Sequence, residues 1–331
     1  MKKELISILI PFYGNEDFLE NTLDSVKSQT YDNLEIIIVN DCSLSKDKNN
    51  RDFLQIIKEY IQKNKKLITI RYFENEANMG TFETRRKCFM KSSGKYCFFM
   101  DNDDTLTPSC IEKLYTKAKE TNADIVQGTA SIIYKEGTPV EKIENTNIAV
   151  NRVHTGTLEG NDILDDWLCN GGHNTLPWAK LYSKEVLAFA FKNIPTVFGN
   201  MSDELMLYYF VTKAANIYCG IEDCVYVYNI SSGLSSRVQI TDLKRWEKVC
   251  SASSTFTILY SSFDEYPPTP KQKAAIQYFC RRSLKSSIKQ LRLSVAPDLY
   301  DKARQMLCDY WGESFVEKME VELDKNHGEV I

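Results

Sequence analysis

Several signatures that would assign a function at once are missing from this 331-residue sequence. No GxGxxG follows an apolar run and no GxxxxGK occurs, so neither a dinucleotide-binding fold nor a P-loop is supported. Ten cysteines form no CxxC pair and only three histidines accompany them, so we expect no zinc site, no disulfide framework and a reducing cytoplasm. No apolar run approaches the ~20 residues of a membrane span. The start, MKKELISILIPFYGNE, lacks the small-residue cleavage site of a signal peptide.

The composition that remains is that of an ordinary globular protein. Hydrophobic residues make up 43% of the chain and charged residues 26%, and the net charge is −4. Such a balance gives no reason to expect a nucleic-acid partner. The sequence therefore predicts a soluble cytoplasmic protein that can bury roughly 75% of its unfolded surface.

Apolar runs and helical periodicity alternate over the first hundred residues. Continuous apolar runs, typical of strands in a parallel sheet covered on both faces, occur at 5–12, 34–41, 67–74 and 95–101. Segments with helical spacing separate them at 16–30, 52–64 and 81–93. Strand–helix alternation with short connections predicts an α/β fold with a doubly wound, mostly parallel sheet.

Carboxylates gather at the end of the fourth predicted strand, where FFMDNDDTLTP places Asp101, Asp103 and Asp104 within four positions. In open α/β sheets, ligands bind beyond the carboxyl ends of the strands. Clustered carboxylates raise one another's pKa unless a cation sits among them, and oxygen ligands suit Mg²⁺ or Mn²⁺. The alternative is a solvated acidic turn that caps a helix starting near Pro108.

With these residues the chain resembles the inverting, nucleotide-sugar-dependent glycosyltransferases of family 2, which have the GT-A fold. Matching blocks occur in the family's order at 6–43 (ISILIPFYGNEDFLENTLDSVKSQTYDNLEIIIVNDCS), 78–86 (NMGTFETRR), 99–108 (FMDNDDTLTP), 177–185 (PWAKLYSKE) and 201–210 (MSDELMLYYF). The resemblance implies a GT-A domain over 1–240, with a nucleotide-binding half (1–108) and an acceptor-binding half (109–240), and a helical C-terminal region over 241–331.

The resemblance also assigns the donor site. It implies that Pro11, Tyr13 and Asn15 line the nucleotide pocket, that Asp41 accepts the uracil N3 proton and that Arg85 lies near the uracil and diphosphate. The family usually has two aspartates and a glycine before the serine. In NDCS, Asn40 and Cys42 replace the first aspartate and the glycine, and Asp41 is kept. The alternatives are a turn or helix-capping aspartate for Asp41 and an exposed helix arginine for Arg85.

Asp101 and Asp103 match the family's DxD motif. The resemblance implies that these carboxylates reach the ribose and bind a Mn²⁺ or Mg²⁺ ion that bridges the two phosphates of the donor. Positive charge there stabilises the departing diphosphate. Asp104 is expected to be structural or to support the metal ligands from behind.

MSDELMLYY matches the family's Glu-Asp pair ahead of a helix, with Ser202 in the glutamate position. The resemblance implies that Asp203 is the general base for the acceptor hydroxyl. Glu204 is the rival, and an acidic first turn that only complements the helix dipole is the structural alternative. Trp178 matches a position near the donor sugar but is as easily a core residue. His173, in the Gly-rich NGGHN, is more readily structural than catalytic, and the polar segment 135–160 is expected to build acceptor specificity.

An apolar stripe at helical spacing follows the Pro-rich break PPTPKQ; it consists of Ile276, Cys280, Leu284, Ile288, Leu291 and Val295. Basic residues crowd the remainder of that helix, namely Arg281, Arg282, Lys285, Lys289 and Arg292. Two alternatives stay open: peripheral contact with the cytoplasmic face of the inner membrane, or packing on the catalytic domain with a solvated basic face. DLKRW (242–246) differs from the QxxRW of processive family members, so we expect one sugar per encounter.

These features together predict an enzyme that moves a single sugar, best guessed as galactose or N-acetylgalactosamine, from a UDP-sugar to a glycan or lipid-linked glycan acceptor. The layout is similar to that of bacterial galactosyltransferases that build lipooligosaccharide and capsule. One alternative is a sugar-nucleotide nucleotidyltransferase, but PFYGNEDF has no basic residue to hold a triphosphate. The other is a non-catalytic glycan-binding protein, which would have lost the carboxylates. The sugar, the acceptor, the choice of metal and the oligomeric state cannot be deduced from the sequence.

Overall fold

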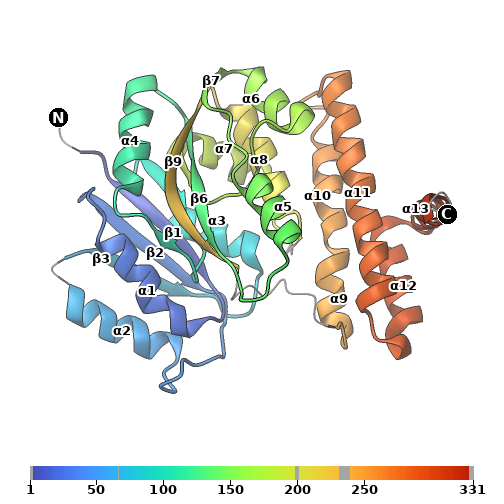
Figure 1. Cartoon of the computed structure of the whole chain (residues 1–331), viewed down its shortest axis with the longest axis horizontal. Helices are drawn as coiled ribbons and strands as arrows, with labels where there is room; N and C mark the ends of the chain where they lie inside the picture. Colours follow the sequence, from blue (N-terminus) through green and yellow to red (C-terminus); the bar gives the residue numbers. More distant parts are fainter. Residues whose placement is uncertain (1–2, 66, 198–200, 231–238, 328–331) are drawn as a thin grey trace. The chain divides into compact units, whose positions relative to one another are not determined.

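The computed structural model describes residues 3–65, 67–197, 201–230 and 239–327, and Figure 1 labels its helices and strands. The chain forms two compact units. The first comprises residues 1–196 and 207–233, and the second comprises residues 197–206 and 234–331. These units are defined by compactness alone, so the division into a transferase domain (1–240) and a C-terminal region (241–331) stays a proposal.

Within the described residues, a mixed sheet of nine strands forms the centre of the first unit. The strands run in the order β3-β2-β1-β4-β8-β6-β9-β5, and β7 pairs with β9. Neighbours from β3 to β4 are parallel, whereas β8 is antiparallel to both β4 and β6. The bounds are β1 Ile6–Phe12, β2 Leu34–Asn40, β3 Thr69–Glu74, β4 Tyr96–Phe99, β5 Thr105–Leu106, β6 Ile125–Ile133, β7 Gly156–Glu159, β8 Lys180–Ser183 and β9 Ile217–Asn229. The predicted α/β class and the alternation over residues 5–101 are confirmed.

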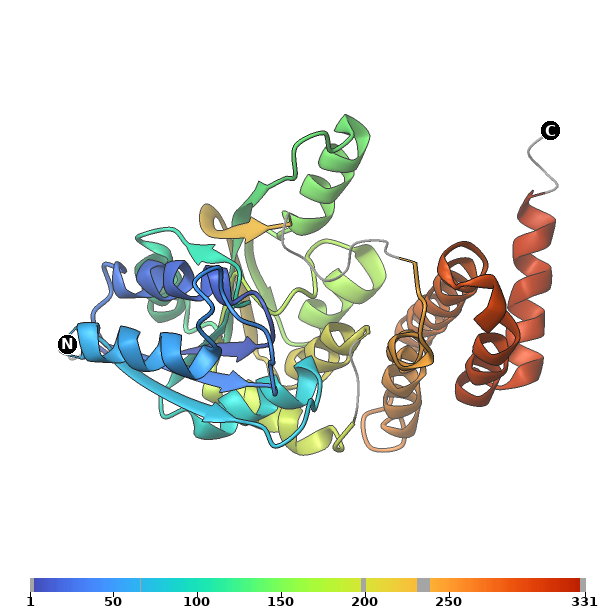
Figure 2. The ribbon, with the colours of Figure 1, turned by 90° about the horizontal axis from the view of Figure 1, so that it is seen from below.

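Helices cover both faces of this sheet, as the continuous apolar strands require. Phe98 shares a buried cluster with Leu23 of α1 on one face. Phe99, the next residue, points the other way and contacts Phe191 of α7, which also contacts Phe82 of α3. In Figure 2, α5 projects away from the sheet, and its side chains are mostly exposed. The bounds are α1 Glu16–Lys27, α2 Phe53–Asn64, α3 Thr81–Lys91, α4 Cys110–Thr121, α5 Val140–Val150, α6 Asn161–Asp165, the π-helix η1 Asp166–Asn170, α7 Lys184–Asn193 and α8 Asp203–Ala214.

The register of the parallel strands aligns three strand ends at one edge. Phe12 of β1 is paired with Asn40 of β2, and Leu9 of β1 with Phe99 of β4. The loops that follow β1, β2 and β4 therefore leave the sheet side by side. These loops contain the polar residues predicted to bind the nucleotide and the metal.

The second unit is helical. Its elements are α9 Leu243–Cys250, α10 Ala252–Ser261, α11 Pro270–Ser294, the 3₁₀ helix η2 Pro297–Leu299, α12 Tyr300–Trp311 and α13 Glu313–His327. Trp246 of α9 is 0% exposed and donates from Nε1 to the Ala303 carbonyl of α12 at 2.8 Å. Thr269 and Gln272 form a capping box that starts α11, with Pro270 at a position where the missing N–H costs nothing.

The apolar stripe predicted along α11 is buried inside this unit. Leu284, Ile288 and Leu291 are 0% exposed and belong to the same apolar cluster as residues of α9, α12 and α13. The stripe could enter a bilayer only if the unit unpacked, so the structure supports packing, here on the neighbouring helices. No helix in the described ranges is both long enough and apolar enough to cross a membrane.

The basic face of α11 is partly neutralised rather than fully solvated. Arg281 and Lys285 pair with Glu322 of α13, and Arg292 pairs with Asp324 at 2.7 Å. These ion pairs lie at the surface, where each contributes little to stability. They nevertheless give three of the five predicted cations an acidic partner.

Replacing Trp246 tests whether this residue is the centre of the helical unit. We expect Trp246→Ala to destabilise the unit by about 3–5 kcal/mol, because it leaves a cavity in the apolar cluster and removes the hydrogen bond to the Ala303 carbonyl. Trp246→Phe should cost less, since it fills most of the volume. Thermal unfolding followed by circular dichroism measures both changes. Tyr278→Ala, on the exposed side of α11, is the control and should change stability by no more than about 0.5 kcal/mol; equal effects of the two alanine variants would contradict this role.

Candidate active site

The loops that follow β1 and β4 are hydrogen-bonded to each other. Asn15 donates from Nδ2 to Oδ2 of Asp103 (3.1 Å), and Asn102 donates from Nδ2 to the Gly14 carbonyl (2.6 Å). Gly14 and Asn15 have φ angles of 69° and 64°, in the left-handed region that glycine and asparagine tolerate best. Two such residues in succession turn the chain from β1 into α1. The turn brings Asn15 to Asp103.

Asp104 lies beneath the turn that follows β4 and is 0% exposed. Its carboxylate oxygens accept from the Tyr226 hydroxyl and the Asn229 amide, both at 2.7 Å. Burial, reinforced by the charge of Asp101, raises the pKa of the Asp104 carboxyl to about 8. The Tyr226 hydroxyl also accepts from the Asp101 amide at 3.1 Å. The turn is therefore anchored through Asp104, and a fully solvated acidic turn does not describe this residue.

Asp101 forms an ion pair with Arg85 at this edge. Its Oδ1 lies 3.2 Å from Nη2 of Arg85, and its side chain is 32% exposed. Arg85 is 7% exposed, although it lies on α3, so the exposed-arginine alternative is wrong. The pair fixes a buried guanidinium at this edge, where its charge is matched by the Asp101 carboxylate.

Asp101 and Asp103 fit a small divalent cation. Both are partly exposed at the strand edge, and both offer carboxylate oxygens. Within the part of the chain that the structure describes, no group of three or more His, Cys, Asp or Glu side chains is arranged as a complete protein cage for a metal. Mg²⁺ and Mn²⁺ do not need one, because Mg²⁺ is usually bound by one or two carboxylates together with substrate phosphates.

Asp41 follows β2, is 3% exposed and fixes the loop before α3. Its Oδ1 accepts from the Met79 amide and the Asn75 side chain, both at 2.7 Å, and its Oδ2 accepts from the Gly80 amide at 2.9 Å. Asp41 therefore makes the contacts expected of a turn or helix-capping aspartate, the alternative to a uracil-binding role. A carboxylate has about four acceptor sites, so three bonds leave capacity for one more donor. Contact with uracil stays a prediction.

Pro11 and Tyr13 differ in accessibility. Pro11 is buried within β1, in register with Val39 of β2, so its ring is part of the sheet layer. Tyr13 follows the strand and is 43% exposed. Of the two, Tyr13 has the surface that a ligand could contact directly.

Ser43 joins the loops after β1 and β2, a link that was not predicted. Its Oγ donates to Oε1 of Glu16 (2.6 Å) and accepts from the Gly14 amide (3.0 Å). The Ser43 amide in turn donates to Oδ1 of Asn40 at 3.0 Å. Only the presence of serine in NDCS could have indicated this residue from the sequence.

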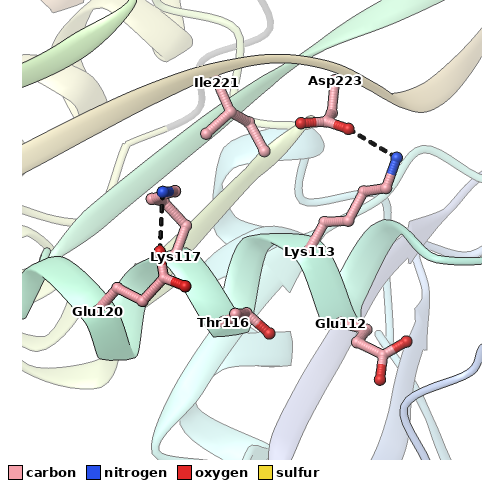
Figure 3. A pocket seen from close by; sticks show the side chains of 7 residues that line it. All are labelled: Glu112, Lys113, Thr116, Lys117, Glu120, Ile221 and Asp223. Carbon is pink, nitrogen blue, oxygen red and sulfur yellow. Dashed lines mark hydrogen bonds and ion pairs between the residues drawn. The ribbon is translucent and has the colours of Figure 1, made fainter.

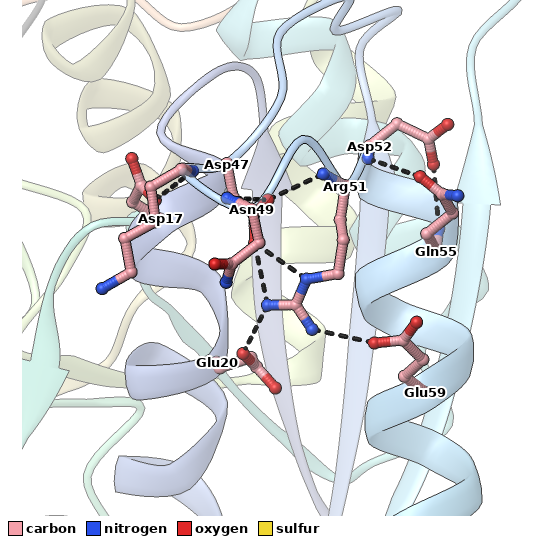
Figure 4. Close-up of polar contacts among 9 residues, drawn as sticks. Asp17, Glu20, Asp47, Asn49, Arg51, Asp52, Gln55 and Glu59 are labelled. Atoms are coloured by element: carbon pink, nitrogen blue, oxygen red, sulfur yellow. Dashed lines mark hydrogen bonds and ion pairs between the residues drawn. The ribbon is translucent and has the colours of Figure 1, made fainter.

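Arg51 anchors the far end of the same loop, as Figure 4 shows. Its guanidinium binds three carboxylates, those of Asp47, Glu20 of α1 and Glu59 of α2, each at 2.8 Å. The Asp47 side chain is 3% exposed and also accepts from the Arg51 amide at 2.7 Å. These bonds fix the C-terminal end of the loop over residues 41–52 to α1 and α2.

Trp178 is a core residue in this structure. It is 4% exposed, and its indole stacks on Tyr226 with 4.7 Å between centroids and 9° between planes. A second contact, to Tyr228, has a centroid distance of 5.0 Å. The packing favours the core alternative, and contact with the donor sugar stays a prediction. Through Tyr226, Trp178 nevertheless supports the turn that holds Asp101.

His173 is buried and belongs to a structural cluster. Its Nδ1 lies 2.6 Å from Oδ2 of Asp166, whose other oxygen lies 3.1 Å from Nδ1 of His154. Its ring stacks on Tyr218 at 4.4 Å. Desolvation lowers the pKa of His173. A stacked imidazole with 2% exposure supports the structural interpretation over a catalytic one.

Asp203 is the first residue of α8 and is 5% exposed. Its Oδ1 accepts from the Glu204 amide at 3.1 Å, and Ser202 before it has a φ of 62°. Asp203 and Glu204 belong to the second unit, whereas the other predicted site residues all belong to the first. The strand edge described above therefore contains residues predicted to form the donor site, and the role of Asp203 as the base also stays a prediction.

A hollow of about 240 Å³ opens between α4 and β9 and contains none of the predicted site residues. Figure 3 shows that charged side chains line it, with ion pairs between Lys113 and Asp223 (2.7 Å) and between Lys117 and Glu120 (2.8 Å). Its cations are thus already neutralised, and we assign it no role.

Comparison with known proteins gives the chain a family. The model described as "Glycosyl transferase family 2" matches residues 7–189. Glycosyltransferase GlyA of Streptococcus pneumoniae is 28% identical over 244 residues, which cover 70% of this chain but only 32% of GlyA. Poly(ribitol-phosphate) beta-N-acetylglucosaminyltransferase TarP of Staphylococcus aureus is 33% identical over 153 residues, 45% of this chain and 43% of TarP. The chain thus spans less than half the length of either relative.

Solved structures share the fold. The crystal structure of S. aureus TarS 1–349 in complex with UDP superimposes with a TM-score of 0.56 at 16% identity, over 98% of this chain and 92% of that one. Mannosyltransferase PcManGT from Pyrobaculum calidifontis, in complex with GDP-Man and Mn²⁺, gives a TM-score of 0.54 at 12% identity, over 97% and 87%. These likenesses establish a GT-A transferase fold. Since the family model matches more than half of the length of this chain, the chain belongs to glycosyl transferase family 2 and is a glycosyltransferase.

Proposed function

We propose that this glycosyltransferase moves a single sugar from a UDP-sugar to a hydroxyl of a cell-surface glycan, with inversion at the anomeric carbon. The observation that carries the proposal is the strand edge of the first unit. There Asp101 pairs with Arg85, and Asp103 accepts from Asn15. Two partly exposed carboxylates beside a fixed guanidinium suit a diphosphate that arrives with a divalent cation.

The donor's uridine is proposed to meet Asp41 and Tyr13. A carboxylate accepts a hydrogen bond from the N3–H of uracil. Cytosine has no such N–H, so Asp41 would select uracil over cytosine. TarS was solved with UDP and with UDP-GlcNAc, which supports a uridine donor for a chain of the same fold. Galactose or N-acetylgalactosamine remains the proposed sugar, and N-acetylglucosamine is the first competitor to test.

Asp101 and Asp103 would hold Mn²⁺ or Mg²⁺, which supplies positive charge to the diphosphate as it leaves. Arg85 would add a second positive group that is already in place before the reaction, because its ion pair and its burial fix it. PcManGT contains Mn²⁺ in its complex with GDP-Man, in agreement with a metal on this fold.

The acceptor hydroxyl is proposed to lose its proton to Asp203 as its oxygen attacks the anomeric carbon from the side opposite the diphosphate. Asp203 is the first residue of α8, and a carboxylate at that position can accept the proton of a hydroxyl. Glu204, the next residue, is the rival. The acceptor is proposed to be lipooligosaccharide, capsule or a lipid-linked precursor, reached by peripheral contact with the inner membrane. TarP, which acts on poly(ribitol-phosphate), supports a cell-surface polymer as the acceptor class.

The metal and donor site is tested by thermal unfolding with UDP-Gal, UDP-GalNAc, UDP-GlcNAc and GDP-Man, each with Mn²⁺ and with EDTA. A donor at 100 times its Kd adds about 2.7 kcal/mol, which raises Tm by a few degrees. We expect this for one UDP-sugar, with loss of the shift in EDTA and in Asp103→Asn. Asp162→Asn, an exposed aspartate of α6, is the matched control and should keep the shift. No shift with any nucleotide sugar would contradict the proposed donor.

The base is tested by Asp203→Asn. We expect kcat to fall roughly 10²–10⁴-fold, since a positioned base contributes about that much. The UDP-sugar thermal shift should persist, because the substitution leaves the donor site intact. Glu204→Gln is the control and should keep most of kcat. A larger loss in Glu204→Gln than in Asp203→Asn would reassign the role to Glu204.

The choice of nucleobase is tested with Asp41→Asn, whose affinities for UDP and for CDP are measured by calorimetric titration. The variant should bind UDP roughly 10–100-fold more weakly, because a charge-assisted hydrogen bond is lost. Affinity for CDP should change less, so the preference for UDP should shrink. A parallel loss for both nucleotides would mean that Asp41 acts only by holding the 75–80 loop.

A further inference from the structure

One face of α11 is exposed and bears no acidic residue. At spacings of three and four residues, its side chains are Tyr278, Arg282, Ser286, Lys289 and Leu293. Tyr278 is 61% exposed and Leu293 is 83% exposed. This face is separate from the predicted apolar stripe, which is buried. An exposed leucine and tyrosine on the same line as two cations require an explanation that packing within the unit does not give.

The two cations of this face keep their charge available. Arg281, Lys285 and Arg292 are engaged by acidic residues of α13. By contrast, no ion pair or hydrogen bond from a described residue reaches Arg282 or Lys289. Glu322 and Asp324 are thus directed to the neighbouring rows of α11, and no ion pair with a described residue neutralises the exposed row.

We propose that this exposed row of α11 binds the surface of a bilayer that contains anionic lipids. Lys and Arg are attracted to anionic headgroups, while Tyr and Leu enter the interface between headgroups and acyl chains. The row from Tyr278 to Leu293 spans about 22 Å at 1.5 Å per residue, so its charged and apolar groups can meet a flat surface together. A nucleic acid would engage the cations and leave Leu293 in water, so it fits this row less well.

Membrane binding by this row does not depend on the proposed function. Only its biological purpose does, which is to bring the enzyme to a lipid-linked acceptor. Two cations and two apolar side chains predict weak, reversible attachment rather than an anchor. Binding should therefore depend on lipid charge and on ionic strength.

Flotation of the full-length protein with vesicles tests this surface. Phosphatidylcholine vesicles are compared with vesicles that also contain phosphatidylglycerol, at low and high NaCl. We expect binding to the anionic vesicles at low salt, with at least a roughly tenfold loss in Arg282→Glu/Lys289→Glu. Lys302→Glu/Lys318→Glu, on α12 and α13, makes the same charge change at exposed positions and should keep most of the binding. Tyr278→Ser/Leu293→Ser should weaken binding without changing its dependence on lipid charge.

Several results would overturn the proposal. One is equal binding to neutral and anionic vesicles, and another is an equal loss in the control pair, which would mean that total charge decides. Binding to a soluble polyanion such as heparin, unaffected by Tyr278→Ser/Leu293→Ser, would identify a polyanion surface instead. A change of oligomeric state in those variants would identify contact between copies of the chain. The UDP-sugar thermal shift of every variant should equal that of the wild type, so failure here is distinguishable from failure of the proposed function.

Discussion

The burial of one carboxylate beneath the turn after β4 is the constraint on which the site depends. Asp104 can lie inside the protein only because the Tyr226 hydroxyl and the Asn229 amide satisfy its oxygens. Tyr226 comes from a strand more than a hundred residues away, and Trp178 stacks on it. The turn that presents Asp101 and Asp103 is therefore held by two distant segments, β9 directly and the segment around Trp178 through Tyr226. It is not a flexible acidic loop that a ligand must first order.

The sequence was informative wherever a local pattern decides the structure. Continuous apolar runs predicted the strands from β1 to β4, and the place of Asp101 after such a run predicted a ligand edge. It was uninformative wherever the contact is long-range. Nothing near Arg51 indicates that it meets Glu20 and Glu59, and nothing near Tyr226 indicates that it meets Asp104. Trp178 shows the same limit, since one sequence cannot say whether an indole stacks on a sugar or on a tyrosine.

The C-terminal helices illustrate a related point. Periodicity correctly identified Leu284 and Ile288 as members of one face of a helix, but it could not say what covers that face. The acidic helix α13, which had no predicted role, pairs with part of the basic face. Only the three-dimensional arrangement separates the cations that are engaged, such as Arg292, from those that remain, such as Lys289.

The acidic cluster after β4 carries less charge in the fold than three free aspartates would. Asp101 is balanced by Arg85, and burial raises the pKa of Asp104, which disfavours its charged form. An anionic ligand therefore meets less repulsion at this edge than three free carboxylates would exert. The fold lowers the electrostatic barrier to an approaching polyanion while it keeps the oxygen atoms of both outer aspartates at the surface.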